Sequence, residues 1–168
     1  TNDRKGCIDS DGDGWSDPEP GWLAQNGADA FLLEPTQWLD SDNDNFGDNL
    51  DGYQGDHCPY RRGYSLMDRY GCLDSDGDGY SDADPGGLDG VTAWYAHPTG
   101  SGDSFPFDDT QWSDTDADGY GDNWANESWN LTREEWGIGS FLLSATTPDA
   151  CPFITGASSG DRYGCTDT

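Results

Sequence analysis

The chain has 168 residues and a formal net charge of −27, and hydrophobic residues make up only 32% of it. So little apolar surface and so much charge of one sign argue against an ordinary globular core. The charge also excludes nucleic acid as a partner, because phosphates are repelled, and it favours cations. No apolar stretch approaches the length of a membrane-spanning helix, about 20 residues. Eight Trp and eight Tyr, in turn, argue against a disordered tail.

Two sequence blocks recur along the chain and predict a tandem repeat. The first reads DRKGCIDSDGDGWSD from Asp3 and DRYGCLDSDGDGYSD from Asp68, and it begins again as DRYGCTDT at Asp161. The second reads TQWLDSDNDNFGDN from Thr36 and TQWSDTDADGYGDN from Thr110. We therefore predict repeat unit 1 over residues 3–67, repeat unit 2 with insertions over residues 68–160, and the start of a third unit over residues 161–168.

Each full unit contains two Asp-rich loops of the form D-x-D-x-D-x-aromatic-x-D. A chain that turns tightly around an ion presents alternate side chains inward, so D-x-D-x-D supplies three carboxylates. Ca²⁺ takes six to eight oxygen ligands, which these carboxylates begin to provide. We name the loops A1 (residues 9–17), B1 (40–48), A2 (74–82) and B2 (114–122). The predicted carboxylate ligands at positions 1, 3, 5 and 9 are Asp9, Asp11, Asp13, Asp17, Asp40, Asp42, Asp44, Asp48, Asp74, Asp76, Asp78, Asp82, Asp114, Asp116, Asp118 and Asp122.

Positions 6 and 7 of the loops are also restricted. Position 6 must reverse the chain, which favours the left-handed conformation and hence Gly or Asn. The residues there are Gly14, Asn45, Gly79 and Gly119. Position 7 is always aromatic; we expect its carbonyl to face the ion and its ring to pack outward on a neighbouring segment. These residues are Trp15, Phe46, Tyr80 and Tyr120.

The loops lack the features of an EF-hand, which needs flanking helices and a bidentate Glu at position 12. Position 12 is Pro20, Asp51, Pro85 or Ala125, and the flanks are rich in Gly, Pro and Asn. Further ligands must therefore come from elsewhere, with Glu19, Asp51, Asp84, Asp56 and Asp149 as the candidates. Of these we assign Asp51, Asp56 and Asp149 to the metal sites. Magnesium is a poorer candidate than calcium, because it prefers few protein ligands and retained water.

Five cysteines are present. Cys58 and Cys72 have the same spacing as Cys151 and Cys165, each pair running from Cys-Pro to Arg-Tyr-Gly-Cys, and we predict both pairs as disulfides. A bridge across a loop of about 15 residues contributes on the order of 3 kcal/mol in the entropic description. Cys7 is left over, and the phase of the repeat predicts a partner in a Cys-Pro upstream. Zinc is disfavoured because no C-x-x-C or Cys/His cluster exists.

DSDGDGWSD, DSDGDGYSD, DTDADGYGD and the DHCP and DACP segments resemble thrombospondin type 3 repeats and the related D-x-D-x-D-G calcium-binding repeats of bacterial and archaeal surface proteins. The resemblance covers the loops and cysteines, and the aromatic linkers here are longer. It implies a mostly irregular, calcium-organised tandem repeat outside the cell, with at least four calcium ions. We expect short strands and turns, little helix and no single large core.

The aromatic linkers and two glycosylation sequons complete the candidate features. Trp38 and Trp112 of the TQW segments are expected to form small aromatic cores with Phe31 and Phe105 beside each B loop, and the alternative is a glycan-stacking role. Glycosylation sequons begin at Asn126 and Asn130, in the insertion of unit 2.

No nucleophile pattern accompanies either histidine, His57 or His97, and we expect no enzymatic activity. The leading hypothesis is a segment of an extracellular fibre, stalk or cell-surface polymer, rigidified by calcium and disulfides. An adhesin-type module for glycan or protein and a calcium-binding spacer of a secreted enzyme are the alternatives. Disulfides together with calcium at extracellular levels predict a location outside the cytosol.

Overall fold

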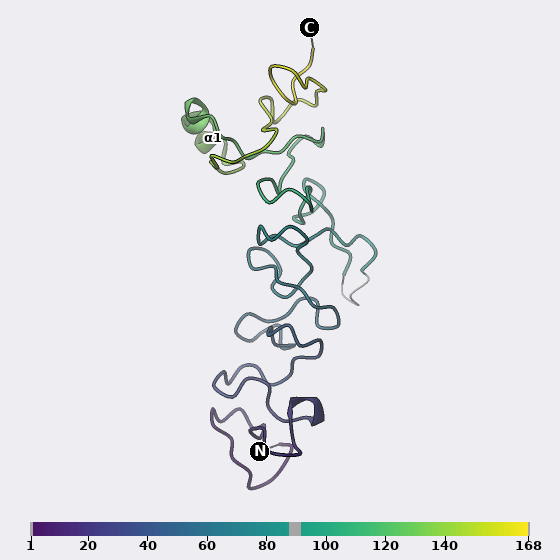
Figure 1. The fold of residues 1–168 in the computed structure, drawn as a ribbon, viewed down its shortest axis with the longest axis vertical. Coiled ribbons are helices and arrows are strands. Elements are labelled where there is room, and N and C mark those ends of the chain that lie inside the picture. The colour runs from purple at the N-terminus through teal and green to yellow at the C-terminus, as the bar shows by residue number, and fades with distance from the viewer. Residues whose placement is uncertain (1, 88–91, 168) are drawn as a thin grey trace. The chain divides into compact units, whose positions relative to one another are not determined.

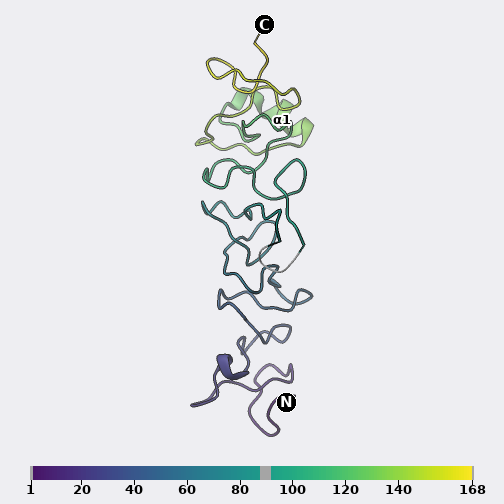
Figure 2. The same ribbon diagram turned by 90° about the vertical axis from the view of Figure 1, so that its right-hand side faces the viewer.

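The computed structural model describes residues 2–87 and 92–167, and nearly all of them form loops and turns (Figures 1 and 2). The helical segments are the 3-10 helices η1 (Ala24–Asn26) and η2 (Glu127–Trp129) and the α-helix α1 (Asn130–Trp136). Isolated bridges take the place of strands in the described residues. A mostly irregular fold with little helix is therefore confirmed, while the expected short strands are not formed.

The scarcity of helix results from the placement of Gly, Pro and Asn. Many of the 24 glycines have positive φ angles, a conformation that ends or prevents a helix. The segment that forms α1 is free of both Gly and Pro. It ends at Gly137, which has a φ of 68° and whose N–H donates to the carbonyl of Arg133 at 2.9 Å.

The described residues divide into two compact units, one extending to Leu73 and the other beginning at Asp74. Within each unit the interior is polar. The buried hydrophobic residues of the described ranges are few: Ala28, Cys58, Cys72, Trp124 and Cys165. Buried polar residues are more numerous and include Asp29, Gln37, Asp56, Asp103, Gln111, Asn123, Arg133 and Asp149. Burial of such groups is costly unless they find hydrogen-bond partners or counter-ions, so these contacts organise the fold.

A buried glutamine before each B loop holds the chain that leaves the loop. The Gln37 side chain accepts a hydrogen bond from the N–H of Asn49 and donates to the carbonyls of Asn49 and Tyr53 at 2.8 and 3.1 Å. Gln111 makes the matching pair of bonds with Asn123, at 2.9 and 3.1 Å. The entry and exit of loops B1 and B2 are thereby tied together.

The glutamines also explain position 8 of the loops. This position is Gly in the B loops, at Gly47 and Gly121, and a Cβ on either would overlap the side chain of Gln37 or Gln111. The A loops carry Ser there, as Ser16 and Ser81, both fully buried.

The insertion of unit 2 folds around Arg133 on α1. This side chain is buried, and its guanidinium lies 5.9, 5.3 and 5.8 Å from the ring centroids of Trp124, Trp129 and Trp136. It also donates a hydrogen bond to the carbonyl of Asp149. Cation–π contacts with three rings compensate part of the cost of burying the charge. Burial lowers the pKa of Arg133, an effect that the carboxylates of Asp149 and Asp122 oppose.

Candidate metal centres

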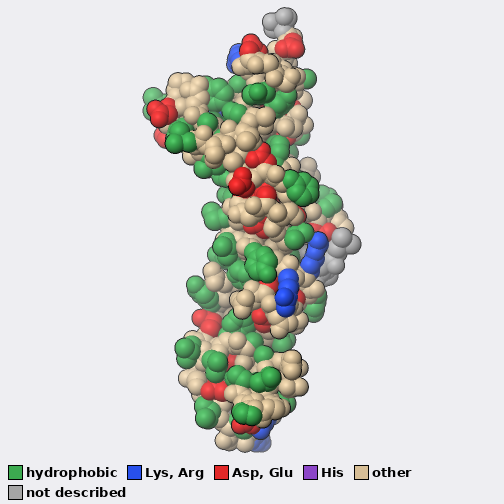
Figure 3. Space-filling view, in the orientation of Figure 1, with side chains coloured by type: hydrophobic (Ala, Val, Ile, Leu, Met, Phe, Trp, Pro, Cys, Tyr) green, Lys and Arg blue, Asp and Glu red, His purple; other side chains and the backbone are tan. Residues whose placement is uncertain are grey.

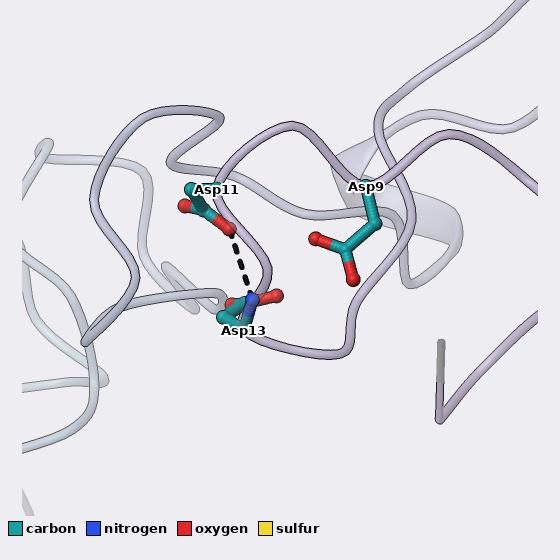
Figure 4. Close-up of side chains that lie close together, drawn as sticks. All are labelled: Asp9, Asp11 and Asp13. Carbon is teal, nitrogen blue, oxygen red and sulfur yellow. Dashed lines mark hydrogen bonds between the residues drawn. The ribbon is translucent and has the colours of Figure 1, made fainter.

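In every loop the aspartates at positions 1, 3 and 5 converge. One carboxylate oxygen from each lies within 4.8 Å of the others, close enough for a shared metal ion. Figure 4 shows this arrangement in loop A1, where Asp9, Asp11 and Asp13 face the inside of one turn. The remaining triplets are Asp40, Asp42 and Asp44; Asp74, Asp76 and Asp78; and Asp114, Asp116 and Asp118. On the face drawn in Figure 3, acidic side chains emerge only as small separate patches.

The backbone reversals that shape the loops occur where left-handed residues were expected. Position 6 has φ angles of 100°, 77°, 97° and 91° at Gly14, Asn45, Gly79 and Gly119. Position 4 is left-handed too, which the sequence reasoning missed. The residues at position 4 are Gly12, Asn43, Gly77 and Ala117, with φ angles of 82°, 64°, 84° and 61°. Two left-handed residues separated by one aspartate turn the three carboxylates to the same side.

Backbone N–H groups fix the carboxylates at positions 1 and 5. In loop A1 the N–H groups of Gly12 and Gly14 donate to the two oxygens of Asp9, at 2.8 and 3.2 Å. The N–H of Trp15 donates to Asp13 at 2.7 Å. The bonds from positions 6 and 7 recur in the other three loops. The loop therefore holds its own carboxylates in place.

Position 9, predicted as a ligand, makes a different kind of contact. In loop A1 the two oxygens of Asp17 accept from the N–H and the hydroxyl of Ser10, at 2.9 and 2.6 Å. Asp48, Asp82 and Asp122 bind the Ser or Thr at position 2 of their loops in the same way. Through these hydrogen bonds, the aspartate at position 9 holds the end of each loop to its start. The Ser or Thr at position 2 of all four loops is the sequence feature that indicates this contact.

Several loop carboxylate oxygens are buried and have no hydrogen-bond partner among the described residues. They include both oxygens of Asp42, both oxygens of Asp116, and one oxygen each of Asp11, Asp13 and Asp76. A buried anionic oxygen without a donor carries a large desolvation cost. A divalent cation removes this cost for several oxygens at once, and hard oxygen ligands are the ones that Ca²⁺ prefers. The donor set therefore fits a hard cation.

A fourth aspartate from outside each loop is hydrogen-bonded through its backbone N–H to the carbonyl at position 8 of that loop. For the B loops these are Asp56 and Asp149, both predicted from the Asp-x-Cys-Pro segments and both about 1% exposed. The N–H of Asp56 donates to the carbonyl of Gly47 at 2.7 Å, and the N–H of Asp149 donates to that of Gly121 at 2.8 Å. In each, one carboxylate oxygen accepts from the cysteine N–H two residues on, at 2.7 Å, and the other oxygen is buried without a partner in the described ranges.

For the A loops the corresponding residues are Asp29 and Asp103, which sequence reasoning missed. Both are about 2% exposed, and their N–H groups donate to the position-8 carbonyls of Ser16 and Ser81 at 2.9 Å. The sequence does contain a feature that marks these two residues. Both occur as Asp-x-Phe at the same spacing before the Gln of TQW. We call Asp29, Asp56, Asp103 and Asp149 the closing aspartates.

Burial and the carboxylates of the adjacent loop act on the pKa of every closing aspartate in the same direction. Burial raises the pKa of Asp103 to about 8, that of Asp56 and Asp149 to about 7, and that of Asp29 to about 6. In each, the N–H two residues on opposes the shift, and carboxylates of the adjacent loop raise the pKa further. The pKa of Asp42, inside loop B1, is raised to about 6 by burial and by its neighbours.

The position-7 rings pack on neighbouring segments, as predicted, but A and B loops use different ones. In the A loops Trp15 stacks on Trp38 at 6.2 Å between centroids, and Tyr80 stacks on Trp112 at 4.9 Å. In the B loops the partner is the tyrosine of Arg-Tyr-Gly-Cys: Phe46 pairs with Tyr70 at 6.0 Å and Tyr120 with Tyr163 at 5.6 Å. Trp38 and Trp112 thus contact the rings of the A loops, where we had expected aromatic cores beside the B loops.

Both predicted disulfides, Cys58–Cys72 and Cys151–Cys165, are formed, with Cα atoms 5.1 Å apart in each. The chain segment that each disulfide encloses packs on loop B1 or B2. The N–H groups of Gly63 and Gly156 donate to the second oxygens of Asp44 and Asp118, each at 3.0 Å. Cys7 forms no disulfide within the described residues, so its predicted partner upstream stays a prediction.

The remaining candidate ligands, like the closing aspartates, are not members of the converging triplets. Asp51 is exposed after loop B1, and the converging triplets do not include it. Glu19 forms an ion pair with Arg4 at 2.5 Å. Asp84 is buried, and its backbone bonds to Trp94 in both directions.

The two sequons and His97 have distinct environments. Asn126 is exposed, and its side-chain oxygen accepts from the N–H and hydroxyl of Ser128. Asn130 is half-buried, and its side chain accepts from the indole N–H of Trp124 at 2.7 Å. Asn126 is therefore the more accessible of the two. His97 packs against loop B2, where its Nδ1 contacts the backbone of Asp114.

Comparison with protein-family models, with curated proteins and with solved structures finds no match for this chain. Within the described part of the chain, no helix combines the length and apolar character needed to cross a bilayer.

Proposed function

We propose that the chain is a calcium-built structural scaffold, a segment of an extracellular fibre, stalk or cell-surface polymer that is rigidified by calcium and disulfides. The observation that carries this proposal is the recurrence of buried, partnerless carboxylate oxygens in four loops of similar construction within the described residues. A protein with so few buried apolar residues needs another source of folding free energy. Ion binding supplies it, because the metal binds the folded loops and not the unfolded chain.

The ligands proposed for each ion are the triplet carboxylates and the position-7 carbonyl, joined in the B loops by Asp56 or Asp149. The aspartates at position 9 and Asp51 belong to the predicted set as well, and calcium sites often use some of their ligands through water. Oxygen-only ligands favour calcium over zinc. The number of carboxylates per site favours calcium over magnesium, which dehydrates reluctantly.

The scaffold role rests on the repeated sequence blocks and on the resemblance to thrombospondin type 3 and D-x-D-x-D-G repeats. Both formed disulfides suit an oxidising compartment outside the cytosol. Assembly with further repeats, or self-association into a fibre, is part of the same proposal. No catalytic role is proposed for any residue.

Calcium titration of the isolated chain tests the proposal. We expect at least four calcium ions per chain by calorimetry or equilibrium dialysis, together with a rise in melting temperature and a gain in aromatic circular dichroism. Magnesium at the same concentration should be a weaker substitute. A chelated protein with an unchanged melting temperature and an unchanged aromatic signal would falsify the calcium scaffold.

Exposed tyrosines favour the adhesin-type module as a second candidate. Tyr60 and Tyr64 lie within the loop closed by Cys58–Cys72 and are 75% and 65% exposed. Trp112, by contrast, is stacked on Tyr80. Aromatic rings at a surface offer stacking platforms for sugars and for protein partners. Binding on a glycan array that is lost in a Tyr60→Ala/Tyr64→Ala variant would support this role, and filaments formed by both proteins alike would support the scaffold.

A further inference from the structure

We propose that Asp103 supplies a carboxylate ligand to the metal of loop A2 from outside that loop, and that Asp29 does the same for loop A1. The inference rests on the proposed calcium function and extends it. It adds two ligands that the loop motif does not contain. It also assigns the ion of each A loop a mechanical role, since the metal would tie the loop to the linker on its C-terminal side.

The position of Asp103 is fixed by two hydrogen bonds. Its backbone N–H donates to the carbonyl of Ser81 in loop A2 at 2.9 Å, and its Oδ1 accepts from the N–H of Phe105 at 2.7 Å. Asp82 and Asp103 also form an isolated bridge. These contacts hold the backbone of Asp103 against loop A2 and leave one carboxylate oxygen for another partner.

That second oxygen, Oδ2, is buried and has no hydrogen-bond partner in the part of the chain that the structure describes. The whole residue is 2% exposed, and the charged groups that act on it are the carboxylates of Asp78, Asp76 and Asp82. A buried oxygen whose charged neighbours are carboxylates is unfavourable unless a cation lies between them. A divalent ion held by loop A2 meets this requirement.

The same arrangement occurs at all four closing aspartates, which argues against a chance contact. Asp29, Asp56, Asp103 and Asp149 each donate their N–H to the position-8 carbonyl of a loop and each accept from the N–H two residues on. Two of them, Asp56 and Asp149, precede cysteines, and the other two precede phenylalanines. The same geometry in A and B loops, from different sequence motifs, indicates a shared demand from the site itself.

The competing interpretation is a buried aspartate that serves only to cap its own turn. Asp103→Asn separates the two roles, because the amide oxygen still accepts from the Phe105 N–H while the side chain loses its charge. Asp109→Asn is the matched control, since Asp109 is an exposed acid in the same segment. Both variants change the net charge equally.

Calcium titrations of the whole chain, followed by calorimetry and by terbium luminescence, distinguish the roles. We expect terbium bound in loop A2 to be sensitised by the Tyr80–Trp112 ring pair, because Tyr80 belongs to that loop. We expect Asp103→Asn to weaken one site by about tenfold or more, because calcium affinity depends on the number of charged ligands, and Asp109→Asn to match the wild type. Equal affinities in the two variants would overturn the inference while the calcium scaffold stands. Absence of calcium binding in the wild type would overturn both.

Asp29→Asn repeats the comparison in the other unit, where terbium is sensitised by the Trp15–Trp38 pair. If Asp103→Asn does not regain the aromatic circular dichroism of the folded protein at saturating calcium, the variant is misfolded. The Asp29→Asn titration then tests the ligand proposal in its place. Weakening of one site supports the inference there, and an unchanged titration overturns it.

Discussion

The A and B loops have nearly the same sequence and hold their carboxylates in the same way, yet they are closed differently. Each B loop lies under a disulfide loop that donates an N–H to its position-5 aspartate. No disulfide loop covers the A loops within the described residues, and their rings stack on a tryptophan of the next TQW segment. A covalent bond thus helps to close each B loop, whereas the A loops depend on non-covalent contacts.

This difference teaches that one local motif serves two kinds of module. The loop itself organises the triplet in both. The segment on the C-terminal side of each loop decides how stable the module is when the metal is absent. The A loops should therefore be the sites that respond most strongly to calcium, and the B loops should be the sites that persist without it.

Removal of calcium should have the largest effect. We expect chelation to expose the backbone of residues 9–31 and 74–87 far more than that of residues 40–48 and 114–122, because the disulfide loops that cover the latter stay closed. Hydrogen exchange followed by mass spectrometry, with and without chelator, measures this directly. Equal loss of protection in the two sets of segments would erase the distinction between A and B loops.

The pH dependence of the chelated protein is the next expected effect. The closing aspartates have folded-state pKa values raised to between about 6 and about 8. The folded chain therefore binds more protons than the unfolded one, so their contribution is fully present below about pH 4 and is lost as the pH rises to about 8. Saturating calcium should reverse the trend, since the ion binds the deprotonated carboxylates. Denaturant midpoints at several pH values test both directions. A midpoint in chelator that rises between pH 4 and pH 8 would contradict the assignment.

Loss of one disulfide should turn a B module into an A-like one. Cys58→Ala/Cys72→Ala is expected to reduce the free energy of unfolding by about 3 kcal/mol, the entropic contribution of a loop of this length. Segment 56–72 should then become as calcium-dependent as the A loops in hydrogen exchange. Cys7→Ser is the control, because Cys7 forms no disulfide in the described residues. A variant whose segment 56–72 stays protected in chelator would show that the disulfide is not what distinguishes B from A.

The glycine at position 8 distinguishes the B loops sterically. Gly121→Ala places a Cβ against Gln111, and we expect a loss of about 1–3 kcal/mol from this overpacking. Gly160→Ala, where the added Cβ meets nothing within 4 Å, should leave the stability nearly unchanged. Thermal or chemical unfolding of both variants checks the difference. Equal stabilities would mean that Gln111 can move without cost.

Position 4 gives the smallest expected effect. Ala117 in loop B2 has a φ of 61°, which is unfavourable for a residue with a Cβ, whereas Gly77 in loop A2 adopts 84° freely. Ala117→Gly should therefore stabilise the protein by about 1 kcal/mol, and Gly77→Ala should destabilise it by a similar amount. Calcium-saturated unfolding curves measure both. Changes of the same sign in the two variants would contradict the strain argument.

Local residue types were sufficient to predict each loop. The spacing of Asp9, Asp11 and Asp13 gives the converging triplet, and Gly14 gives the reversal at position 6. The Asp-x-Cys-Pro segments pointed to Asp56 and Asp149, because cysteine marks where the chain returns. Asp29 and Asp103 escaped notice because Asp-x-Phe lies in a linker of variable length.

The amino-acid sequence by itself determined the Asp-rich loops, the pairing of cysteines by their spacing and the shortage of helix. These are short-range properties, set by φ preferences and by fixed distances along the chain. The tertiary structure alone decided which ring each position-7 aromatic meets and that a distant aspartate is hydrogen-bonded to each A loop. Such contacts depend on where a linker returns in space, and insertions change its length without changing the residues that meet.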